Sequence, residues 1–230
     1  MNDWQTETGR KALLYSFIEG FGACRKGALV TAGDYGFHVA LYDSPGRSGE
    51  YFACEPVSNE LLTKLKPDEW LTVVGDVGRL MPAGQNGLKV LVDELFMLAD
   101  IAALEQSSEE IEAFLVRDPA QIATINASGE ISPFEPNDRS FLFVVTVEGS
   151  AAATARYGVA DDGDIVVDRV STAPAFRRRG LARRVMMALA AHAARAGHRR
   201  ALLISSDQGE PLYRSLGYQV VAPVRVFAAA

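Results

Sequence analysis

A β-rich segment runs through an arginine and glycine turn into an alanine-rich helix in the stretch Val170-Ser171-Thr172-Ala173-Pro174-Ala175-Phe176-Arg177-Arg178-Arg179-Gly180-Leu181-Ala182. The first N–H groups of a helix have no acceptor inside the helix, and the helix dipole adds about half a positive charge there. Gly180 and Ala182 lack bulk, so a ligand can approach the backbone closely. We therefore expect an anion, a pyrophosphate in particular, to bind at this turn.

The segments around this turn have clear periodicity. Residues 141–172 read as an antiparallel meander of three strands, 141–147, 151–159 and 165–172, with turn residues between them. A helix over 178–196 follows, with a row of apolar residues and a glycine stop, and its crossover makes the next strand parallel to 165–172. The elements after this helix are a strand over 201–205, a short helix over 207–216, and a strand or hairpin over 218–227.

Two motifs in this region resemble those of the GNAT N-acetyltransferase superfamily. The family's Arg/Gln-x-x-Gly-x-Gly/Ala signature is met by Arg177, Gly180 and Ala182, with Thr172-Ala173-Pro174 before it. A second family element appears some 30 residues later as Leu212-Tyr213-Arg214-Ser215-Leu216-Gly217-Tyr218. The resemblance covers about residues 138–228, roughly 40% of the chain.

The resemblance implies a mixed α+β fold, in which helices flank a mixed, mostly antiparallel central sheet. It implies a C-terminal acetyl-CoA-binding domain over residues 136–230, preceded by an N-terminal α/β region over residues 1–135. The implied activity is transfer of an acetyl group from acetyl-CoA to a primary amine of a small-molecule or amino-acid-like acceptor. A catalytically silent acyl-CoA-binding or regulatory module is the alternative.

The resemblance also implies roles for individual residues. The backbone of Val170, Ser171 and Thr172 would pair with the pantetheine arm of acetyl-CoA, at a point where this strand splays from its neighbour. Tyr213 would be the general acid that protonates the departing CoA thiolate. The remaining residues of the acetyl-CoA site, which would meet its phosphates, are Arg177, Arg178, Arg179, Gly180, Leu181, Ala182 and Arg183.

The reaction needs a neutral amine, so a carboxylate or a chain of water must remove a proton. Period-2 alternation puts Val166, Asp168, Val170 and Thr172 on one face of the third strand, and Asp168 is the only acid among them. Asp168 is therefore our candidate base. An ion pair with a neighbouring arginine is the alternative interpretation.

Charge is distributed unevenly along the chain. Residues 165–230 carry a formal charge of +8, whereas residues 1–164 carry −14. A local positive field attracts an anionic ligand even in an acidic protein. Nucleic-acid binding fits poorly, because the chain is acidic overall and lacks aromatic residues interleaved with its basic ones.

Several other classes are disfavoured by the residues present. His38, His192 and His198 have no metal-ligand spacing, so we predict no metal site. Cys24 and Cys54 are far apart, so we expect free thiols. No basic leader or long apolar window occurs, which predicts a soluble, cytoplasmic protein without membrane contact. The oligomeric state stays open, a homodimer included.

The first 130 residues are harder to interpret. We expect an amphipathic helix over 9–24, strands over 37–42 and 51–54, and a helix over 58–66. Residues 70–74 form an apolar run, and residues 88–104 fit a strand, a helix, or one followed by the other. A capping pattern at Ser107 predicts a helix over 107–116.

Residues 104–135 are too short to supply the strand and two helices that precede the meander in a complete GNAT fold, so something earlier must contribute. Two arrangements are open: a degenerate GNAT-like half before a compact one, or a single larger sheet. No second Arg-x-x-Gly-x-Gly element occurs in this part. We expect one acetyl-CoA site, with acidic N-terminal residues lining the acceptor cleft.

Overall fold

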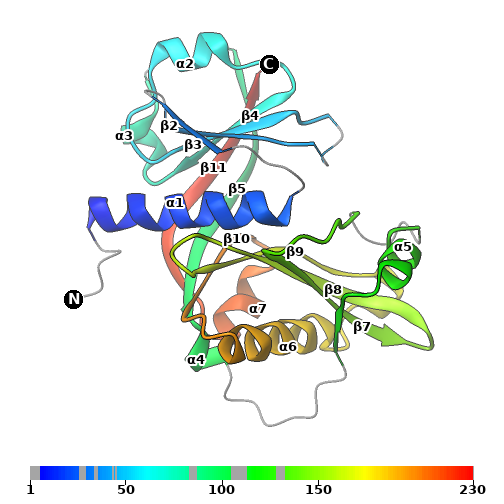
Figure 1. The fold of residues 1–230 in the computed structure, drawn as a ribbon. Coiled ribbons are helices and arrows are strands. Elements are labelled where there is room, and N and C mark those ends of the chain that lie inside the picture. The colour runs from blue at the N-terminus through cyan, green and yellow to red at the C-terminus, as the bar shows by residue number, and fades with distance from the viewer. Residues whose placement is uncertain are drawn as a thin grey trace.

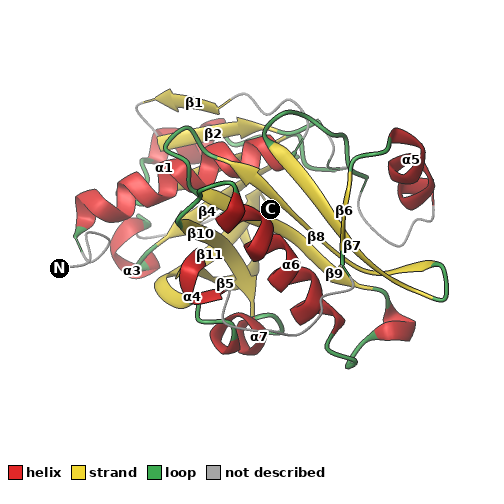
Figure 2. Cartoon of the chain, turned by 60° about the horizontal axis from the view of Figure 1, so that its bottom comes forward, coloured by secondary structure: helices red, strands yellow, loops and turns green. Residues whose placement is uncertain are grey.

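The computed structural model describes residues 6–25, 30–33, 36–42, 44, 46–82, 87–104, 113–127 and 133–229. The fold is mixed α and β, with a mostly antiparallel sheet flanked by helices (Figures 1 and 2). Its helices are α1 (Glu7–Cys24), α2 (Asn59–Lys64), α3 (Val77–Leu80), α4 (Ile101–Leu104), α5 (Pro119–Ala127), α6 (Leu181–Arg195), α7 (Glu210–Ser215) and the 3-10 turn η2 (Pro174–Phe176).

Within the described residues, the strands form one continuous sheet of eleven in the order β1-β2-β3-β4-β11-β5-β10-β9-β8-β7-β6. Two neighbouring pairs, β3 with β4 and β9 with β10, are parallel, and the others are antiparallel. The strands are β1 (Val30–Gly33), β2 (Gly36–Ala40), β3 (Gly49–Ala53), β4 (Glu69–Val74), β5 (Leu88–Asp100), β6 (Phe114–Val116), β7 (Ser140–Val147), β8 (Ser150–Val159), β9 (Ile165–Thr172), β10 (Arg200–Ser206) and β11 (Gln219–Ala229).

The two long strands β5 and β11 connect the N-terminal and C-terminal parts of the sheet. In Figure 1 both run from the lower part of the molecule to the upper part. β5 lies between β10 and β11 and pairs antiparallel with each of them. A strand from the N-terminal half of the chain, β5, therefore lies between two strands from the C-terminal end, β10 and β11.

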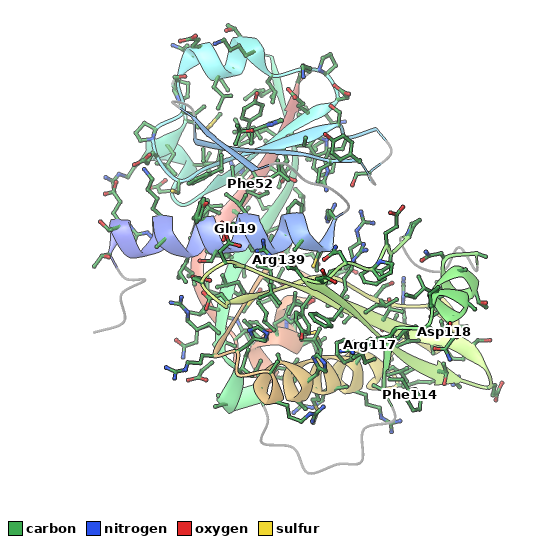
Figure 3. The ribbon with its side chains drawn as sticks, viewed as in Figure 1. Glu19, Phe52, Phe114, Arg117, Asp118 and Arg139 are labelled. Atoms are coloured by element: carbon green, nitrogen blue, oxygen red, sulfur yellow. The ribbon has the colours of Figure 1, made fainter. Side chains whose placement is uncertain are left out.

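Helix α1 covers one face of this sheet and crosses the middle of the molecule (Figure 1). Thr6 caps its start, where the Oγ1 atom accepts a hydrogen bond from the Gly9 amide at 3.0 Å. Its predicted apolar stripe is buried, and Phe17 packs against Phe52 and Phe96 from the sheet. Figure 3 labels Phe52, which lies between β3 and α1.

Two glycines let α1 lie directly on the C-terminal strands. A Cβ atom on Gly158 would stand 2.1 Å from the carbonyl oxygen of Gly20, and one on Gly20 would stand 2.5 Å from Val166. No side chain fits between these backbones. Helix α1 thus belongs to the packing of β8 and β9, although more than a hundred residues separate them in the sequence.

Helix α6 covers the opposite face (Figure 2). Its apolar side, with Val185 and Leu189 fully buried, packs on β7, β8 and β9 and shares a core cluster with Met97 of β5 and Leu203 of β10. Alternation along β5 separates the two cores, since Phe96 joins the α1 cluster and Met97 joins the α6 cluster. Among the described helices, none combines the length and apolar character needed to cross a membrane.

Some elements differ from the sequence-based expectations. Residues 88–104 form a long strand followed by one helical turn. The prediction of a helix over 107–116 is wrong for its last three residues, because Phe114–Val116 form a strand that pairs antiparallel with β7. Residues 107–112 of that prediction lie outside the described residues. Helix α6 begins at Leu181 and α7 at Glu210, each about three residues later than expected.

Candidate functional site

Strands β9 and β10 separate shortly after they begin. Their register holds only two residue pairs, Ala201 with Ile165 and Leu202 with Val166. The rest of β9 pairs with β8 on its other edge. Beyond these two pairs, no described strand pairs with this edge of β9, an arrangement that lets an extended ligand hydrogen-bond the strand's backbone.

A β-bulge accounts for the separation. Thr154 pairs with Ser171 and Arg156 with Asp168, so Arg169 and Val170 together lie opposite one residue of β8. Arg169 has a φ of 51°, in the left-handed region that non-glycine residues seldom adopt. Such a bulge bends its strand and increases the local twist. The bend turns the end of β9, including the predicted pantetheine-binding residues Val170, Ser171 and Thr172, away from β10.

The loop after β9 presents backbone amides at the start of α6. Arg178 and Gly180 have φ values of 62° and 74°, and Gly180 is the N-cap, with no side-chain hydrogen bond. The first bond of the helix runs from the Arg184 amide to the Gly180 carbonyl at 3.1 Å. The amides of Leu181, Ala182 and Arg183 therefore have no acceptor within the helix. A Cβ atom on Gly180 would meet no atom within 4 Å, so the space beside Gly180 itself is open.

The arginines of this loop and Arg183 in the first turn of α6 are exposed, and Arg177, Arg179 and Arg183 contact protein groups. Arg177 donates from Nε to the Thr172 carbonyl at 3.1 Å, and Arg179 stacks over the Phe176 ring at 5.5 Å. Arg183 donates from Nη1 to Ser215 Oγ at 3.3 Å. Phosphate binding by any of them stays a prediction. The loop lies at the end of β9, and its residues do not line the cavity described next.

A cavity of about 310 Å³ lies between α1 and the strands at the centre of the sheet. The C-terminal part of the chain contributes Val170, Ser205, Ser206 and Tyr213 to its wall. The N-terminal part contributes aromatic side chains, among them Phe17, Phe52 and Trp70. The predicted residues Asp168, Val170 and Tyr213 thus line one cavity, next to the gap between β9 and β10.

Tyr213 projects from α7 to this cavity. Its ring contacts Tyr218 edge-on, with centroids 5.7 Å apart. It also lies so close to Gly209 that a Cβ atom there would be 2.8 Å from Tyr213 Cε2. Burial, and next the negative charge of Asp168, raise the pKa of Tyr213 above its ordinary value. The phenol therefore keeps its proton at neutral pH and can donate it.

Asp168 is surrounded by three arginines. Arg25 from α1 binds both carboxylate oxygens, with Nε to Oδ2 at 3.1 Å and Nη2 to Oδ1 at 3.0 Å. The Nε atoms of Arg156 and Arg169 each lie 3.7 Å from Oδ2. Burial alone would raise the pKa of Asp168, but the arginines, Arg25 foremost, outweigh it and lower that pKa. Asp168 is thus an ionised and weakly basic carboxylate.

Two glutamates from the N-terminal part also line the cavity. Glu50 on β3 accepts a hydrogen bond from Thr72 Oγ1 and forms an ion pair with Arg47 at 3.1 Å. The side chain of Glu94 on β5 has neither a hydrogen bond nor an ion pair to any described residue. Burial, followed by the charge of Glu50, raises the pKa of Glu94, and Arg47 opposes this change.

The sequence predicts acidic N-terminal residues in the acceptor cleft without singling out Glu94. The reason is that residues 88–104 fitted a strand and a helix equally well. Period-2 alternation along a strand puts Val92, Glu94 and Phe96 on one face, so a firm strand assignment would have identified the residue.

The chain is similar to known proteins both in sequence and in fold. The sequence model of the acetyltransferase (GNAT) family matches residues 103–218. A search of curated proteins found no match. Similar folds include a GCN5-related N-acetyltransferase from Kribbella flavida, with a TM-score of 0.65 and 19% identity over 95% of both chains.

Two further solved structures are similar over most of the chain. A GCN5-related N-acetyltransferase-like protein from Streptococcus suis has a TM-score of 0.60 and 14% identity, over 98% of this chain and 100% of that one. A putative GNAT-family acetyltransferase from Novosphingobium aromaticivorans has a TM-score of 0.58 and 19% identity, over 88% and 92%.

Proposed function

The chain belongs to the acetyltransferase (GNAT) family, and on this premise we propose that it transfers the acetyl group of acetyl-CoA to a primary amine of a small-molecule or amino-acid-like acceptor. The observation that carries the proposal is the gap between β9 and β10, which opens beside a cavity lined by Tyr213. Residues 136–230 would carry the acetyl-CoA site, and residues 1–135 would complete the acceptor side.

The donor side rests on the loop and the gap together. The pyrophosphate would accept hydrogen bonds from the amides that follow Gly180, where the helix dipole favours negative charge. The pantetheine arm would pair with the free edge of β9 near Val170, which brings the thioester to the cavity. The open space above Gly180 supports this binding mode.

The chemical step would be direct attack of the amine on the acetyl carbonyl. The nitrogen forms a bond to the carbonyl carbon, the bond from that carbon to sulfur breaks, and the CoA thiolate leaves. Tyr213 would donate its proton to the sulfur, a role supported by its position in the cavity wall beside the gap between β9 and β10. The acceptor would occupy the cavity, where Glu94 is the lining carboxylate without an ion pair to a described residue and could hold a cationic amine.

The experiment compares Tyr213→Phe with Tyr218→Phe, using acetyl-CoA and a panel of small primary amines and free amino acids, with release of free thiol as the signal. Loss of the general acid should lower kcat by about 10²-fold or more, with the KM for acetyl-CoA unchanged. The Tyr218 hydroxyl is buried and finds no partner among the described residues, so its removal should leave kcat as in the wild type.

Unchanged turnover in Tyr213→Phe would contradict the role of Tyr213. If the wild-type protein binds acetyl-CoA but acetylates no amine in the panel, the alternative of a catalytically silent acyl-CoA-binding module gains support. Binding is followed independently by the thermal shift that acetyl-CoA produces.

A further inference from the structure

Acetyl transfer to an amine requires a base that takes a proton from the amine, in addition to the general acid Tyr213. A primary amine is mostly an ammonium ion at neutral pH, with a pKa near about 10, and an ammonium nitrogen has no lone pair with which to attack. Some group near the thioester must hold this cation and accept its proton. The inference below rests on the proposed function.

The pairing of β5 with β10 locates Glu94 at the mouth of the gap. Glu94 lies opposite Ser206, the last residue of β10 and the last pair between these two strands. Directly opposed residues of an antiparallel pair have Cβ atoms about 5 Å apart. Ser206 also lines the cavity, and the chain runs from it through a short turn into α7, which carries Tyr213.

The side chain of Glu94 lies on the α1 face of the sheet. Phe96, two residues along the strand, is fully buried in the cluster beneath α1, and alternation puts Glu94 on the same face. Asp93, its neighbour, is exposed on the other face and forms a surface ion pair with Arg225. Glu94 is therefore the residue at the end of the paired part of β5 whose carboxylate lines the cavity.

The other acids of the cavity already have cationic partners. The charged side chains that line it together with Glu94 are Arg25, Arg47, Glu50, Asp168 and Arg169. Glu50 pairs with Arg47, and Asp168 pairs with arginines from α1, β8 and β9. Within the described part of the chain, Glu94 is the cavity carboxylate that lacks such a pair, so an incoming ammonium group can supply one.

We infer that Glu94 binds the ammonium group of the acceptor and takes the proton that its nitrogen loses before attack on the thioester. One proton passes from the ammonium nitrogen to the carboxylate, the nitrogen then forms its bond to the carbonyl carbon, and the bond from that carbon to sulfur breaks. Tyr213 protonates the departing thiolate, and the second proton that the nitrogen loses in becoming an amide returns to the Tyr213 oxygen. Water finally removes the proton from Glu94. This is the role that the strand pattern suggested for Asp168.

The pKa shifts of Glu94 and Asp168 also favour Glu94 as the base. Burial and the charge of Glu50 raise the pKa of Glu94, which makes it a stronger base, whereas the arginines lower the pKa of Asp168. Pairs of acids whose environments move their pKa values apart commonly have different roles. Asp168 with its arginines fits a role in binding α1 to β9.

The test compares Glu94→Gln with Asp93→Asn, which removes one carboxylate charge from the opposite face of the same strand. For the amine that the wild type acetylates best, kcat/KM is measured between about pH 6 and about pH 10. The kcat/KM of Glu94→Gln should be about 10²-fold below that of the wild type at neutral pH. It should then rise about tenfold per pH unit, as the free amine loses its own proton in solution. Asp93→Asn should follow the wild-type profile, and the KM for acetyl-CoA should be unchanged in both.

A Glu94→Gln variant with the wild-type pH profile would overturn the assignment while leaving the proposed function intact. If wild-type protein acetylates no amine, the proposed function fails and the assignment fails with it. A ¹³C NMR titration of glutamate carboxyl carbons gives a second measurement. The signal of Glu94 is the one missing from Glu94→Gln, and it should report a pKa above the ordinary glutamate pKa of about 4.3. A signal at or below that range would also overturn the assignment.

Discussion

Single residues with opposed environments characterise the cavity. Asp168 is buried among three guanidinium groups, and its side chain is 12% exposed. The sequence predicted the position of Asp168 on the cavity face of β9 and offered two roles, a base or an ion-pair partner. Choosing between them depends chiefly on Arg25, which is 143 residues away in the sequence and meets Asp168 only in the folded protein.

Asp168 should make the stability of the protein dependent on pH. Its folded-state pKa is lowered, so its contribution is present above the unfolded-state pKa of about 3.9 and is lost as pH falls through the folded-state value. Asp168→Asn leaves buried arginines without their carboxylate, and should lower the free energy of unfolding by about 3–5 kcal/mol at pH 7. Urea unfolding at pH 7, and at steps down to about pH 3, measures both effects.

Asp93→Asn is the matched control, because it breaks an exposed ion pair that contributes less than about 1 kcal/mol. The difference in free energy of unfolding between Asp168→Asn and the wild type should become smaller as the pH is lowered toward about 3. Equal stabilities of the two variants at pH 7 would contradict the structural role of Asp168.

Among the elements, those with regular alternation were predictable from the sequence. The meander over β7, β8 and β9, together with α6 and β10, follows from period-2 and helical patterns and from turn residues. β5 was ambiguous because apolar residues occur on both of its faces, as in a strand covered on both sides. β6 could not be identified locally, since its strand conformation depends on pairing with β7.

The loop before α6 yields a prediction at this scale. Gly180→Ala forces a side chain into the left-handed region and should lower the free energy of unfolding by about 1 kcal/mol. It also adds a methyl group where the pyrophosphate would lie, so the Kd for acetyl-CoA should rise at least tenfold. Calorimetric titration measures this Kd.

Gly163→Ala gives the matched comparison. Gly163 has a φ of 87° and equally open surroundings, but it lies in the turn between β8 and β9. The Gly163→Ala variant should lose as much stability as Gly180→Ala, but its Kd for acetyl-CoA should equal that of the wild type. If both variants bind acetyl-CoA like the wild type, the loop before α6 is not the pyrophosphate site.

For the whole molecule, the two parts of the chain share one sheet and one cavity. The C-terminal part contains both family motifs and could be recognised from them. The arrangement of the N-terminal part could not, because β5 between β10 and β11, and α1 on β8 and β9, are contacts between residues far apart in the sequence. The division at residue 135 stays a prediction about function, with the acetyl-CoA site after it and most of the acceptor cavity before it.

Charge divides the chain at a later point, near residue 165. The basic residues 165–230 contain the proposed site for the anionic donor, while the acidic remainder of the chain contributes Glu50 and Glu94 to the cavity. An anionic donor and a cationic acceptor would thus meet from opposite sides at Tyr213. The cavity of about 310 Å³ suits a small acceptor.

The most direct test of acetyl transfer is mass-spectrometric analysis of the wild-type protein incubated with acetyl-CoA, carrying a deuterated acetyl group, and the panel of primary amines. We predict that at least one amine gains the deuterated acetyl group, in step with release of free CoA thiol. If no amine gains it, although a thermal shift shows that acetyl-CoA is bound, the account of this protein as an amine acetyltransferase is contradicted.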